Sequence, residues 1–345
     1  MQYGAIPTNL LERIALLAGK VPVPLMDSLF TIMKARGLMA ANSLGVFEGL
    51  SRGPRSADEL AKDLGLDATS LRLLMRSMVW AGYLELRGDQ FSLSSLSRKT
   101  MIRGAEMDLT GFVQWNYVQW RMVEQIENLL KTGHGVDFHK TMTDPDEWAW
   151  YQKGMMDVAR FDAPVLAKAV PVKRGARKLL DVAGSHGVLG AAICRKHPPM
   201  RSLVIDLPKA IQHARALAES AGITDVVDHR AGDIMVSELG SDNDVALLAN
   251  IVHHFMPDQN IELLKRIYAS LTSDGTAAIW ELETPDPESR PNEGDGAALY
   301  FRLTSTALCY SGKEYSRWLR EAGFTRIRIV RPMLSPGSVL VTGRR

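Results

Sequence analysis

Three aspartates offer the clearest chemistry in this sequence. Asp181, Asp206 and Asp233 each stand at or just beyond the end of an apolar run that is typical of a buried strand. Carboxylates at such places suit hydroxyl and ammonium partners, because a pyrophosphate needs bare amides and positive charge instead. A glycine-rich stretch, residues 184–190, follows the first of these runs. Together these features predict a site for a polar, partly cationic ligand.

The glycine-rich stretch has the spacing Gly184-x-x-Gly187-x-x-Gly190, whereas a nicotinamide-binding fingerprint has the spacing G-x-G-x-x-G. We expect glycines here because a side chain would collide with a ligand lying on the turn. Asp206 follows the second strand at about the distance where a carboxylate meets ribose hydroxyls, and Asp233 follows the third, where an adenine would lie. A ligand with an adenosine and a cationic amino-acid tail, S-adenosylmethionine, therefore fits better than a dinucleotide.

A pair of histidines follows the fourth predicted strand. His253 lies at the carboxyl edge of the predicted sheet, where such folds bind their ligands. Histidine titrates near neutrality, so it is suited to taking a proton from a phenol-like hydroxyl that attacks a sulfonium methyl. We therefore predict that His253 is the base, with His254 beside it as the competing candidate.

Strand and helix patterns alternate through the second half of the chain and position these residues. A short strand, the glycine turn and a helix form the opening unit of a Rossmann-like domain. Alternation of this kind predicts a parallel sheet with crossover helices, and the last two strands should pair antiparallel at its edge. The expected strands are residues 179–182, 203–205, 226–230, 244–250, 276–280, 325–330 and 338–342, and the expected helices are 188–196, 209–220, 260–271 and 314–322.

The N-terminal third predicts a small, mainly helical domain. Residues 25–45 are apolar with few breakers and predict one long helix, whose surplus of apolar positions needs a partner. A capping-box pattern at Ser56 opens a short helix, and Asp67 caps a second one over residues 71–81. A hairpin follows, with its turn at Gly88. Two short helices and a hairpin are typical of a winged helix.

A winged helix either binds DNA or serves as a structural, dimerising module. The second helix offers only Arg72 and Arg76 as basic groups, and the hairpin offers only Arg87. DNA binding needs several phosphate contacts on one face, so the sequence favours the structural module. The formal net charge of +2 likewise gives no sign of a nucleic-acid or membrane partner.

Residues 106–172 are rich in aromatic and methionine side chains. At helical spacing such side chains are more often core, but their density here also suits the wall of a pocket for a planar apolar ligand. The candidates for substrate contact are Trp115, Trp120, Tyr151 and Met155.

The amino-acid composition limits the classes of protein to which this chain can belong. The chain is 46% hydrophobic and 23% charged, which is globular composition with length for two or three domains. Its two cysteines, Cys194 and Cys309, fit a reducing compartment and give no metal-binding spacing. The N-terminus lacks a signal-peptide pattern, and no run approaches the roughly 18 apolar residues of a membrane helix. We expect a cytoplasmic protein without a metal.

Several short motifs resemble the family of small-molecule O-methyltransferases of the caffeate and acetylserotonin type. The resemblance covers nearly the whole chain and implies a winged-helix dimerisation domain over residues 1–105, a helical substrate region over 106–172 and a Rossmann-like catalytic domain over 173–345. It also implies a homodimer in which each N-terminal domain closes its partner's pocket. The motifs are Leu180-Asp-Val-Ala-Gly-Ser-His-Gly187, Ile205-Asp-Leu-Pro208, Ala231-Gly-Asp-Ile234, Ile251-Val-His-His-Phe255, Ala277-Ala-Ile-Trp-Glu281, Glu321-Ala-Gly-Phe324 and, upstream, Gln152-Lys-Gly-Met155.

The same resemblance implies roles for particular residues. Asp206 would bind the ribose hydroxyls, and His253 would be the base of methyl transfer to an aromatic or polyketide-like hydroxyl. Glu281 would orient that base, and His254 would face the substrate. The full set expected to bind S-adenosylmethionine is Asp181, Gly184, Gly187, Asp206, Leu207, Asp233, Ile234 and Asn250.

The chain departs from the family pattern at several positions. Ala183 and Ser185 replace glycines of the turn, and Cys309 stands where plant members have a second glutamate beside the base. Glu283 is a candidate substitute for that glutamate. Two alternatives stay open: a relative with changed chemistry, namely C-methylation, hydroxylation, decarboxylation or pericyclic catalysis, and a winged-helix regulator that senses the cofactor.

Overall fold

The computed structural model describes residues 6–285, 288, 290–291, 293–305 and 307–345. The chain divides into two compact units, one ending at Tyr117 and the other beginning at Val118. This boundary falls inside helix α8 (Thr110–Val123), within the segment 106–172 that the sequence set apart as a region of its own. The two units are described separately below.

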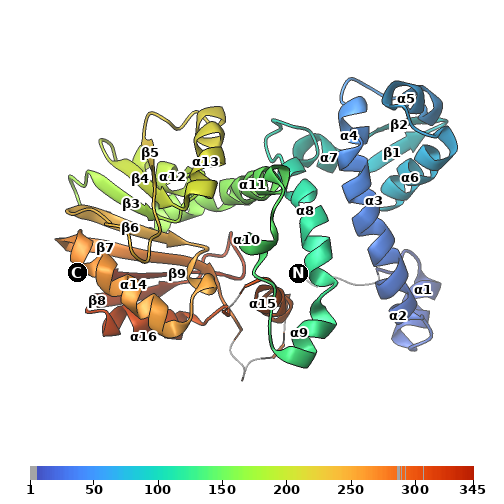
Figure 1. Cartoon of the computed structure of the whole chain (residues 1–345). Coiled ribbons are helices and arrows are strands. Elements are labelled where there is room, and N and C mark those ends of the chain that lie inside the picture. The colour runs from blue at the N-terminus through green and yellow to red at the C-terminus, as the bar shows by residue number, and fades with distance from the viewer. Residues whose placement is uncertain (1–5, 286–287, 289, 292, 306) are drawn as a thin grey trace. The chain divides into compact units, whose positions relative to one another are not determined.

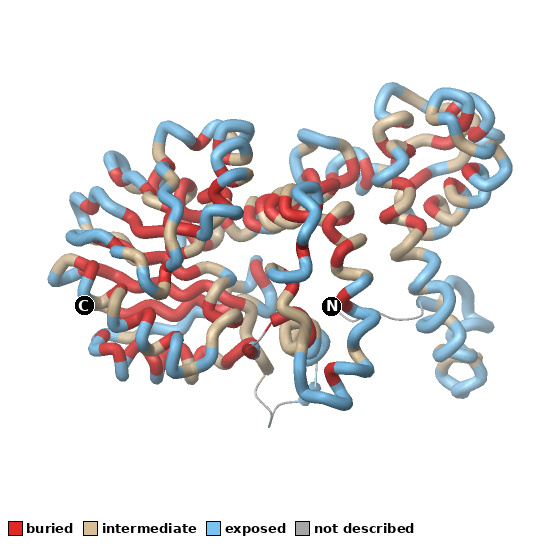
Figure 2. The backbone as a smooth tube through the Cα atoms, viewed as in Figure 1, coloured by how far each residue is buried: buried red, intermediate tan, exposed pale blue. Residues whose placement is uncertain are grey.

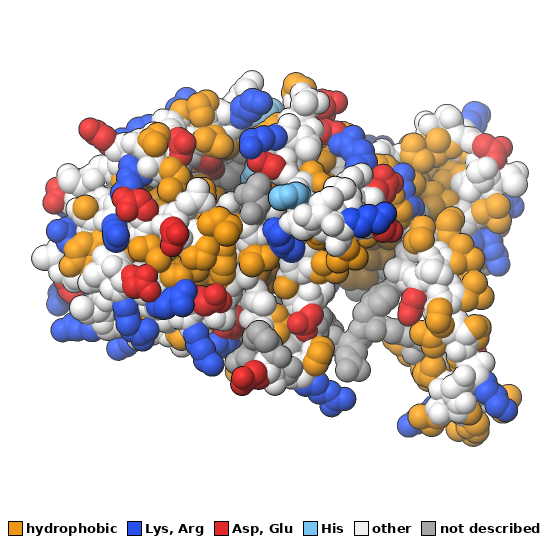
Figure 3. All heavy atoms as spheres, turned by 60° about the horizontal axis from the view of Figure 1, so that its bottom comes forward, with side chains coloured by type: hydrophobic (Ala, Val, Ile, Leu, Met, Phe, Trp, Pro, Cys, Tyr) orange, Lys and Arg blue, Asp and Glu red, His pale blue; other side chains and the backbone are white. Residues whose placement is uncertain are grey.

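The first unit begins with helices that present apolar side chains to solvent. Helix α1 (Leu10–Leu17) is followed by α2 (Val23–Leu25), a π-helical turn η1 (Met26–Phe30) and α3 (Thr31–Ser43). The single helix predicted over residues 25–45 is therefore present without a break over residues 23–43, and it contains a π-helical turn. Figure 3 shows hydrophobic side chains gathered on this part of the unit. The most exposed of them include Leu10, Leu11, Leu17, Leu25, Leu29, Phe30, Ile32 and Met33.

The rest of the first unit contains the predicted helix pair and hairpin. Ser56 and Glu59 form a capping box at the start of α5 (Ala57–Leu64). Asp67 accepts a hydrogen bond from the Ser70 amide at 2.7 Å, so α6 begins three residues earlier than predicted. The remaining elements are α4 (Val46–Gly49), α6 (Ala68–Trp80), β1 (Leu84–Arg87), β2 (Gln90–Leu93) and α7 (Ser95–Thr100).

A seven-stranded sheet forms the centre of the second unit (Figure 1). The strand order is β5-β4-β3-β6-β7-β9-β8. The first five strands of that order are parallel, and β9 pairs antiparallel with both β7 and β8. The predicted α/β fold and its antiparallel edge are confirmed. The strands are β3 (Lys178–Val182), β4 (Arg201–Asp206), β5 (Val227–Ala231), β6 (Asn243–Ala249), β7 (Leu271–Leu282), β8 (Thr325–Val330) and β9 (Ser338–Arg344).

Helices cover both faces of this sheet, and the strands between them are buried (Figure 2). Leu180 and Val182 of β3 pack in a cluster with α14 and α16, whereas Leu179 packs in a cluster with α11 and α12. Successive residues of a strand point to opposite faces, so a strand buried on both faces is apolar throughout. The helices of this unit are α9 (Ile126–Thr132), α10 (Phe138–Thr141), α11 (Pro145–Ala169), α12 (Val188–Lys196), α13 (Pro208–Ser220), η2 (Val252–His254), α14 (Pro257–Ser270), α15 (Glu293–Thr304) and α16 (Gly312–Glu321).

The strand order determines where a ligand site is expected. The chain runs outward from β3 through β4 to β5 and then returns to form β6 on the other side of β3. Ligands of such sheets bind at this switch point, outside the carboxyl ends of the strands. In the part of the chain that the structure describes, no helix is both long and apolar enough to cross a membrane.

Candidate functional site

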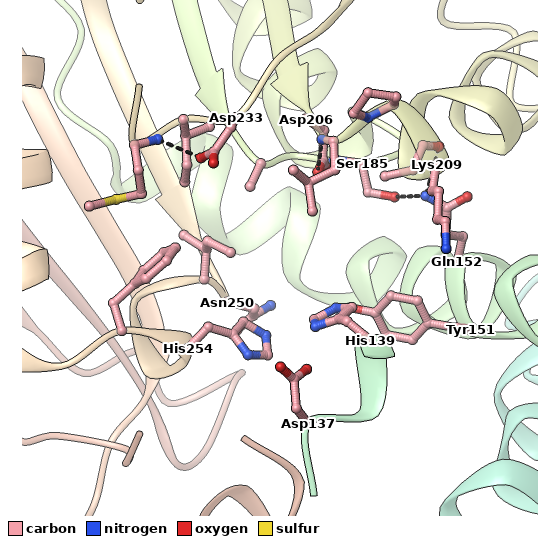
Figure 4. Close-up of a pocket in the computed structure, with 18 of the residues that line it drawn as sticks. Asp137, His139, Tyr151, Gln152, Ser185, Asp206, Lys209, Asp233, Asn250 and His254 are labelled. Atoms are coloured by element: carbon pink, nitrogen blue, oxygen red, sulfur yellow. Dashed lines mark hydrogen bonds between the residues drawn. The ribbon is translucent and has the colours of Figure 1, made fainter. Parts of the chain in front are cut away.

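A pocket with a volume of about 680 Å³ opens at the carboxyl ends of the parallel strands of the second unit (Figure 4). Its walls come from the segments that follow β3, β4, β5 and β6, and from α10 and the start of α11. This volume lies within the range of cofactor and small-molecule sites. The switch point of the sheet is therefore a pocket, as the topology predicts.

One end of the pocket carries two of the three aspartates that the sequence singled out, Asp206 and Asp233, and we call it the carboxylate end. Asp206, at the end of β4, accepts hydrogen bonds from the amides of Ser185 at 3.0 Å and Leu207 at 2.7 Å. Burial raises the pKa of Asp206 to about 6. Asp233, after β5, accepts a hydrogen bond from the Met235 amide at 2.8 Å. Both side chains line the pocket and keep further acceptor capacity for a ligand's hydroxyl or amino groups.

The turn after β3 has the backbone conformation that glycine favours, although two of its residues are not glycine. Ala183 and Ser185 have φ angles of 53° and 46°, and both line the pocket. Ser185 is held at each polar group: its amide donates to Asp206, its carbonyl lies 3.1 Å from His229 Nε2, and its hydroxyl accepts from Gln152 Nε2 at 2.9 Å. These contacts hold a conformation that is strained by about 1–2 kcal/mol for each non-glycine residue.

The glycines of this turn are needed for packing within the protein, a reason that the sequence analysis did not give. A Cβ atom on Gly184 would lie 2.3 Å from the Asp181 carboxyl group, and one on Gly190 would lie 2.6 Å from Asp181 Oδ2. A Cβ atom on Gly187 would lie 2.7 Å from a Val227 methyl group. Packing within the protein therefore excludes side chains here, and the predicted collision with a ligand stays a prediction.

Asp181 lies beneath the turn rather than in the pocket wall. Its side chain is 1% exposed and is not among the residues that line the pocket. Burial raises the pKa of Asp181 to about 7, and the charge of Asp206 adds to the effect. Gly184 and Gly187 are also absent from the pocket lining, whereas the other predicted cofactor residues, Asp206, Leu207, Asp233, Ile234 and Asn250, are all part of it.

His253 and Glu281 form a buried pair beside the pocket. His253 Nδ1 lies 2.8 Å from Glu281 Oε2, and Glu281 Oε1 accepts a hydrogen bond from the Val252 amide at 2.9 Å. The ionised Glu281 carboxylate can only accept hydrogen bonds, so it favours the His253 tautomer that carries its proton on Nδ1. In that tautomer Nε2 is the basic atom. His253 is 4% exposed and does not itself line the pocket, whereas the adjacent His254 does.

Three side chains hold the loop that carries these histidines, and the sequence analysis missed them. Asn260 Nδ2 donates to the carbonyls of Val252 at 2.9 Å and Phe255 at 3.0 Å. The Ser305 hydroxyl donates to the His253 carbonyl at 2.8 Å, and the Tyr310 hydroxyl donates to that of Phe255 at 3.0 Å. The bonds of Ser305 and Tyr310 join residues far apart in the sequence, and those of Asn260 depend on how the loop folds back on α14, so no local sequence pattern signals them.

The opposite end of the pocket is bounded by ring side chains, and we call it the aromatic end. Its residues are His139, Trp148, Tyr151 and His254. The ring of His139 lies 4.9 Å from that of His254, 5.6 Å from that of Tyr151 and 5.7 Å from that of Trp148, between centroids. The structure thus brings the predicted Tyr151 and His254 together and adds His139 and Trp148.

Three of the predicted substrate-binding residues lie elsewhere. Trp115 is 2% exposed and belongs to the first unit, so it packs in a core. Trp120 and Met155 are in the second unit but do not line the pocket. Aromatic and methionine side chains serve core packing as well as ligand walls, and a role of these three residues in substrate binding stays a prediction.

The two positions considered for a second glutamate have different surroundings. Glu283 forms a double ion pair with Arg331, at 2.5 and 2.7 Å, and accepts a hydrogen bond from the Gly312 amide at 2.8 Å. These contacts engage both carboxylate oxygens of Glu283, and its role as a substitute for the second glutamate stays a prediction. Burial raises the pKa of the Cys309 thiol, and the charge of Glu281 adds to this effect, which places a neutral thiol near the His253–Glu281 pair.

Comparison with known proteins gives a consistent set of matches. The model of an O-methyltransferase domain family matches residues 115–325. A 3-hydroxy-5-methyl-1-naphthoate 3-O-methyltransferase of Streptomyces sahachiroi is 29% identical over 330 residues, covering 92% of this chain and 93% of that protein. An L-tyrosine C(3)-methyltransferase of Streptomyces lavendulae is 23% identical, covering 94% of each chain.

The solved structures support the fold. Human N-acetylserotonin methyltransferase in complex with SAM superposes with a TM-score of 0.85 at 17% identity, covering 99% of both chains. At this identity the likeness concerns the fold alone. Together with the family match, it confirms the resemblance drawn from the sequence motifs.

Proposed function

Because this chain belongs to the O-methyltransferase family, whose methyl donor is S-adenosylmethionine, we propose that it methylates a hydroxyl of an aromatic or polyketide-like small molecule with His253 as the general base. The observation that carries this proposal is the His253–Glu281 pair at 2.8 Å, beside a pocket that joins a carboxylate end to an aromatic end. The Streptomyces naphthoate methyltransferase, similar over nearly its whole length, supports an aromatic acceptor.

The carboxylate end fits the cofactor. Asp206 would accept hydrogen bonds from the ribose hydroxyls, and Asp233 would accept one from the adenine amino group. Leu207 and Ile234 would be apolar neighbours of the adenine ring. The negative charge of this end suits a ligand that carries a sulfonium and an ammonium group. When bound, S-adenosylmethionine supplies an electrophilic methyl group whose leaving group departs without protonation.

The protein's tasks are then to position the acceptor and to remove its proton. The aromatic end would hold the acceptor ring through Tyr151 and Trp148. His253 Nε2 would take the hydroxyl proton, and the resulting imidazolium would be stabilised by the Glu281 carboxylate at Nδ1. Burial of the pair strengthens this interaction, because water does not screen it.

A methyl-transfer screen tests the proposal. The purified protein would be incubated with S-adenosylmethionine labelled in its methyl group and with a panel of phenols, naphthols and hydroxyquinones. We expect labelled O-methyl product with at least one aromatic hydroxyl, and its formation should fall sharply in the His253→Ala variant. Transfer to no hydroxyl in the panel, in a protein shown by calorimetry to bind the cofactor, would overturn the O-methylation proposal.

Transfer to carbon is the second candidate, because one relative is named as a tyrosine C(3)-methyltransferase. The same base would serve, since a phenolate activates its neighbouring ring carbon as well as its oxygen. Proton NMR of the products from tyrosine and substituted phenols distinguishes the two outcomes, because an O-methyl ether loses the phenolic proton and keeps every ring proton, whereas a C-methyl product keeps the phenolic proton and loses one ring proton.

We further propose that the protein is a homodimer joined through the N-terminal helices. The chain exposes large apolar side chains along α1, α2, η1 and the start of α3, and Phe30 and Trp80 form an aromatic pair at 6.0 Å in the same region. Contiguous exposed apolar surface of this kind marks an association site. A second copy of the chain is the partner that the family resemblance implies.

A further inference from the structure

A buried glutamine of α11 joins two segments of the carboxylate end, and the proposed reaction leaves it without a role. Gln152 is fully buried and is one of the residues that line the pocket. Its Nε2 atom donates to the Ser185 hydroxyl at 2.9 Å and to the Ala210 carbonyl at 2.9 Å. Ser185 lies in the turn after β3, and Ala210 lies in the first turn of α13, after β4. Figure 4 shows the contact between Gln152 and Ser185, with Asp206 next to Ser185.

The Ala210 carbonyl fixes the direction of the Gln152 amide. A carbonyl oxygen can only accept a hydrogen bond, so the nitrogen of the amide must face it. The reversed amide would set the Gln152 oxygen against the carbonyl oxygen, acceptor against acceptor. Both hydrogens of Nε2 are therefore donated, one to Ala210 and the other to Ser185. Gln152 thus acts on the Ser185 hydroxyl as a donor.

The Ser185 hydroxyl is thereby left with a hydrogen to donate. A hydroxyl has one hydrogen and two lone pairs, and Gln152 uses a lone pair. Within the part of the chain that the structure describes, no group accepts this hydrogen. The backbone of Ser185 is held on both sides, because its amide donates to Asp206 and its carbonyl lies 3.1 Å from His229 Nε2. A residue that lines the pocket therefore presents a hydroxyl donor at a fixed place.

The order of the strands places this donor beside one part of the cofactor. β5, β4 and β3 are consecutive neighbours in the sheet. With the adenine at Asp233 after β5 and the ribose at Asp206 after β4, the next segment along this edge is the turn that contains Ser185. The amino-acid tail, which is joined to the ribose through the sulfur, would therefore lie along this turn. The tail carries an ammonium and a carboxylate, and only the carboxylate can accept a hydroxyl hydrogen.

The lysines of the pocket also favour a carboxylate on this side. Lys140 and Lys209 both line the pocket. Lys140 is paired with the Asp137 carboxylate at 3.0 Å. Lys209 directly precedes Ala210 at the start of α13, and among the described residues it has no ion pair. Its charge favours an anionic group near Ser185, although the contribution of an exposed lysine is small.

We propose that the Ser185 hydroxyl donates a hydrogen bond to the carboxylate of the cofactor's amino-acid tail, and that Gln152 is the positioning residue that aims it. Serine stands here where the family resemblance implies glycine, and it would add a contact that glycine cannot supply. This inference rests on the placement of the cofactor proposed above and is independent of the acceptor and of the base. A hydrogen bond to a charged group corresponds to about 10–100-fold in affinity.

The test measures binding by calorimetry with two ligands, S-adenosylhomocysteine and its decarboxylated analogue, which keeps the adenosine, the sulfur and the amine. Ser185→Ala removes the hydroxyl and should weaken S-adenosylhomocysteine by about 10–100-fold, whereas the decarboxylated analogue should change little. Comparing two ligands on one variant cancels any change in the turn that affects both. Ser185→Gly also relieves the strain at a φ angle of 46°, and it should show the same selective loss, because the hydroxyl rather than the strain is the cause.

Gln152→Met keeps the length of the side chain and removes both donors. It should weaken S-adenosylhomocysteine selectively by about 2–10-fold, less than Ser185→Ala does, because the hydroxyl remains but is no longer aimed. In the Ser185→Ala background the same substitution should add almost no selective loss, because Gln152 acts through the hydroxyl. A merely structural role of Gln152 would instead weaken both ligands, and to the same extent in both backgrounds.

The control is Ser220→Ala, which removes an exposed hydroxyl at the far end of α13, bonded to the Leu217 carbonyl at 2.8 Å, and should change neither affinity. An equal loss for both ligands in Ser185→Ala, or a wild-type protein that binds both equally well, would overturn the inference. Asp206→Asn should weaken both ligands alike through the ribose that they share; if it does, a missing selective loss at Ser185 rejects this contact and leaves the proposed cofactor site intact. A selective loss without methylation of any acceptor would support this contact and reject the proposed methyl transfer.

Discussion

The Nδ1 atom of His253 and the Oε2 atom of Glu281 lie 2.8 Å apart, and both side chains are almost completely buried. The other carboxylate oxygen of Glu281 accepts the Val252 amide at 2.9 Å. Glu281 therefore fixes the ring of the histidine and the backbone that carries it at the same time. Glu281 lies at the end of β7, and His253 lies in the loop after the neighbouring strand β6. The end of one strand therefore fixes the loop that follows the next.

Replacing His253 by alanine should lower turnover by about 10²–10⁴-fold, the usual contribution of a general base. Cofactor affinity should stay nearly constant, because the carboxylate end does not contain this residue. The loss should shrink as the pH approaches the acceptor's own pKa, since solvent then removes the proton. Steady-state kinetics against pH, with calorimetry for the cofactor, give both quantities. An active His253→Ala with a dead His254→Ala would place the base one residue later.

Glu281→Gln should reduce turnover less than loss of the base does, by about 10–10³-fold. Two donors point at this side chain, the Val252 amide and the His253 Nδ1–H, and glutamine offers only one acceptor oxygen. One of them must then face the amide NH₂ group, which loosens the ring or favours the wrong tautomer. The variant should also unfold more readily, by about 1–3 kcal/mol for a buried donor left unpaired. A variant with wild-type kcat would mean that the pair is structural.

Cofactor binding should weaken as the pH falls through about 6, because burial raises the pKa of Asp206 to that value. The ionised carboxylate accepts two ribose hydroxyls better than the protonated form does, so binding must expel a proton below this pH. Asp206→Asn should weaken S-adenosylmethionine binding by about 1–3 kcal/mol at neutral pH and remove this dependence. Titration calorimetry between pH 5 and 8, about one unit or more either side of the transition, measures both effects. Asp181, whose pKa burial raises to about 7, should broaden the transition.

The proposed dimer should depend on the apolar side chains of η1. Leu29 and Phe30 are 50% and 43% exposed in the single chain. Glutamate at both positions would have to be desolvated in an obligate interface, which typically buries roughly 2,000 Å² or more. Sedimentation at micromolar concentration should show a dimer for the wild type and a monomer for the Leu29→Glu, Phe30→Glu variant. Lys34→Glu is a control change of charge in the same region. A wild-type monomer would remove the dimer proposal.

The sequence predicted those parts of the site that depend on the order of the strands. Asp206, Asp233 and His253 each follow a strand, and parallel strands bring their carboxyl ends to one edge. His139 was missed because it lies in a short helix, α10, whose place beside the sheet depends on tertiary packing rather than on periodicity. Asn260 was missed for a related reason: it sits at a helical position that looks like any other, and only the folded loop shows that it caps two carbonyls.

The structure gives the glycine turn a second cause beside the predicted contact with a ligand, and that cause can be tested. A Cβ atom on Gly184 would lie 2.3 Å from both the carboxyl carbon and Oδ1 of Asp181. Gly184→Ala should therefore destabilise the protein by about 1–3 kcal/mol, the usual effect of overpacking a core. Asp181→Ala removes the carboxyl group, whose burial already raises its pKa to about 7, and should change stability less.

The double variant decides between the two causes. If Asp181 is the obstacle, Gly184→Ala with Asp181→Ala should be more stable than the sum of the single changes predicts, by about 0.5–3 kcal/mol of coupling. Urea unfolding without cofactor gives these values, and no ligand contributes to them. Additive effects would mean that Asp181 is not what excludes the side chain. A loss confined to cofactor affinity, with stability unchanged in Gly184→Ala, would restore the ligand as the reason for glycine at this position.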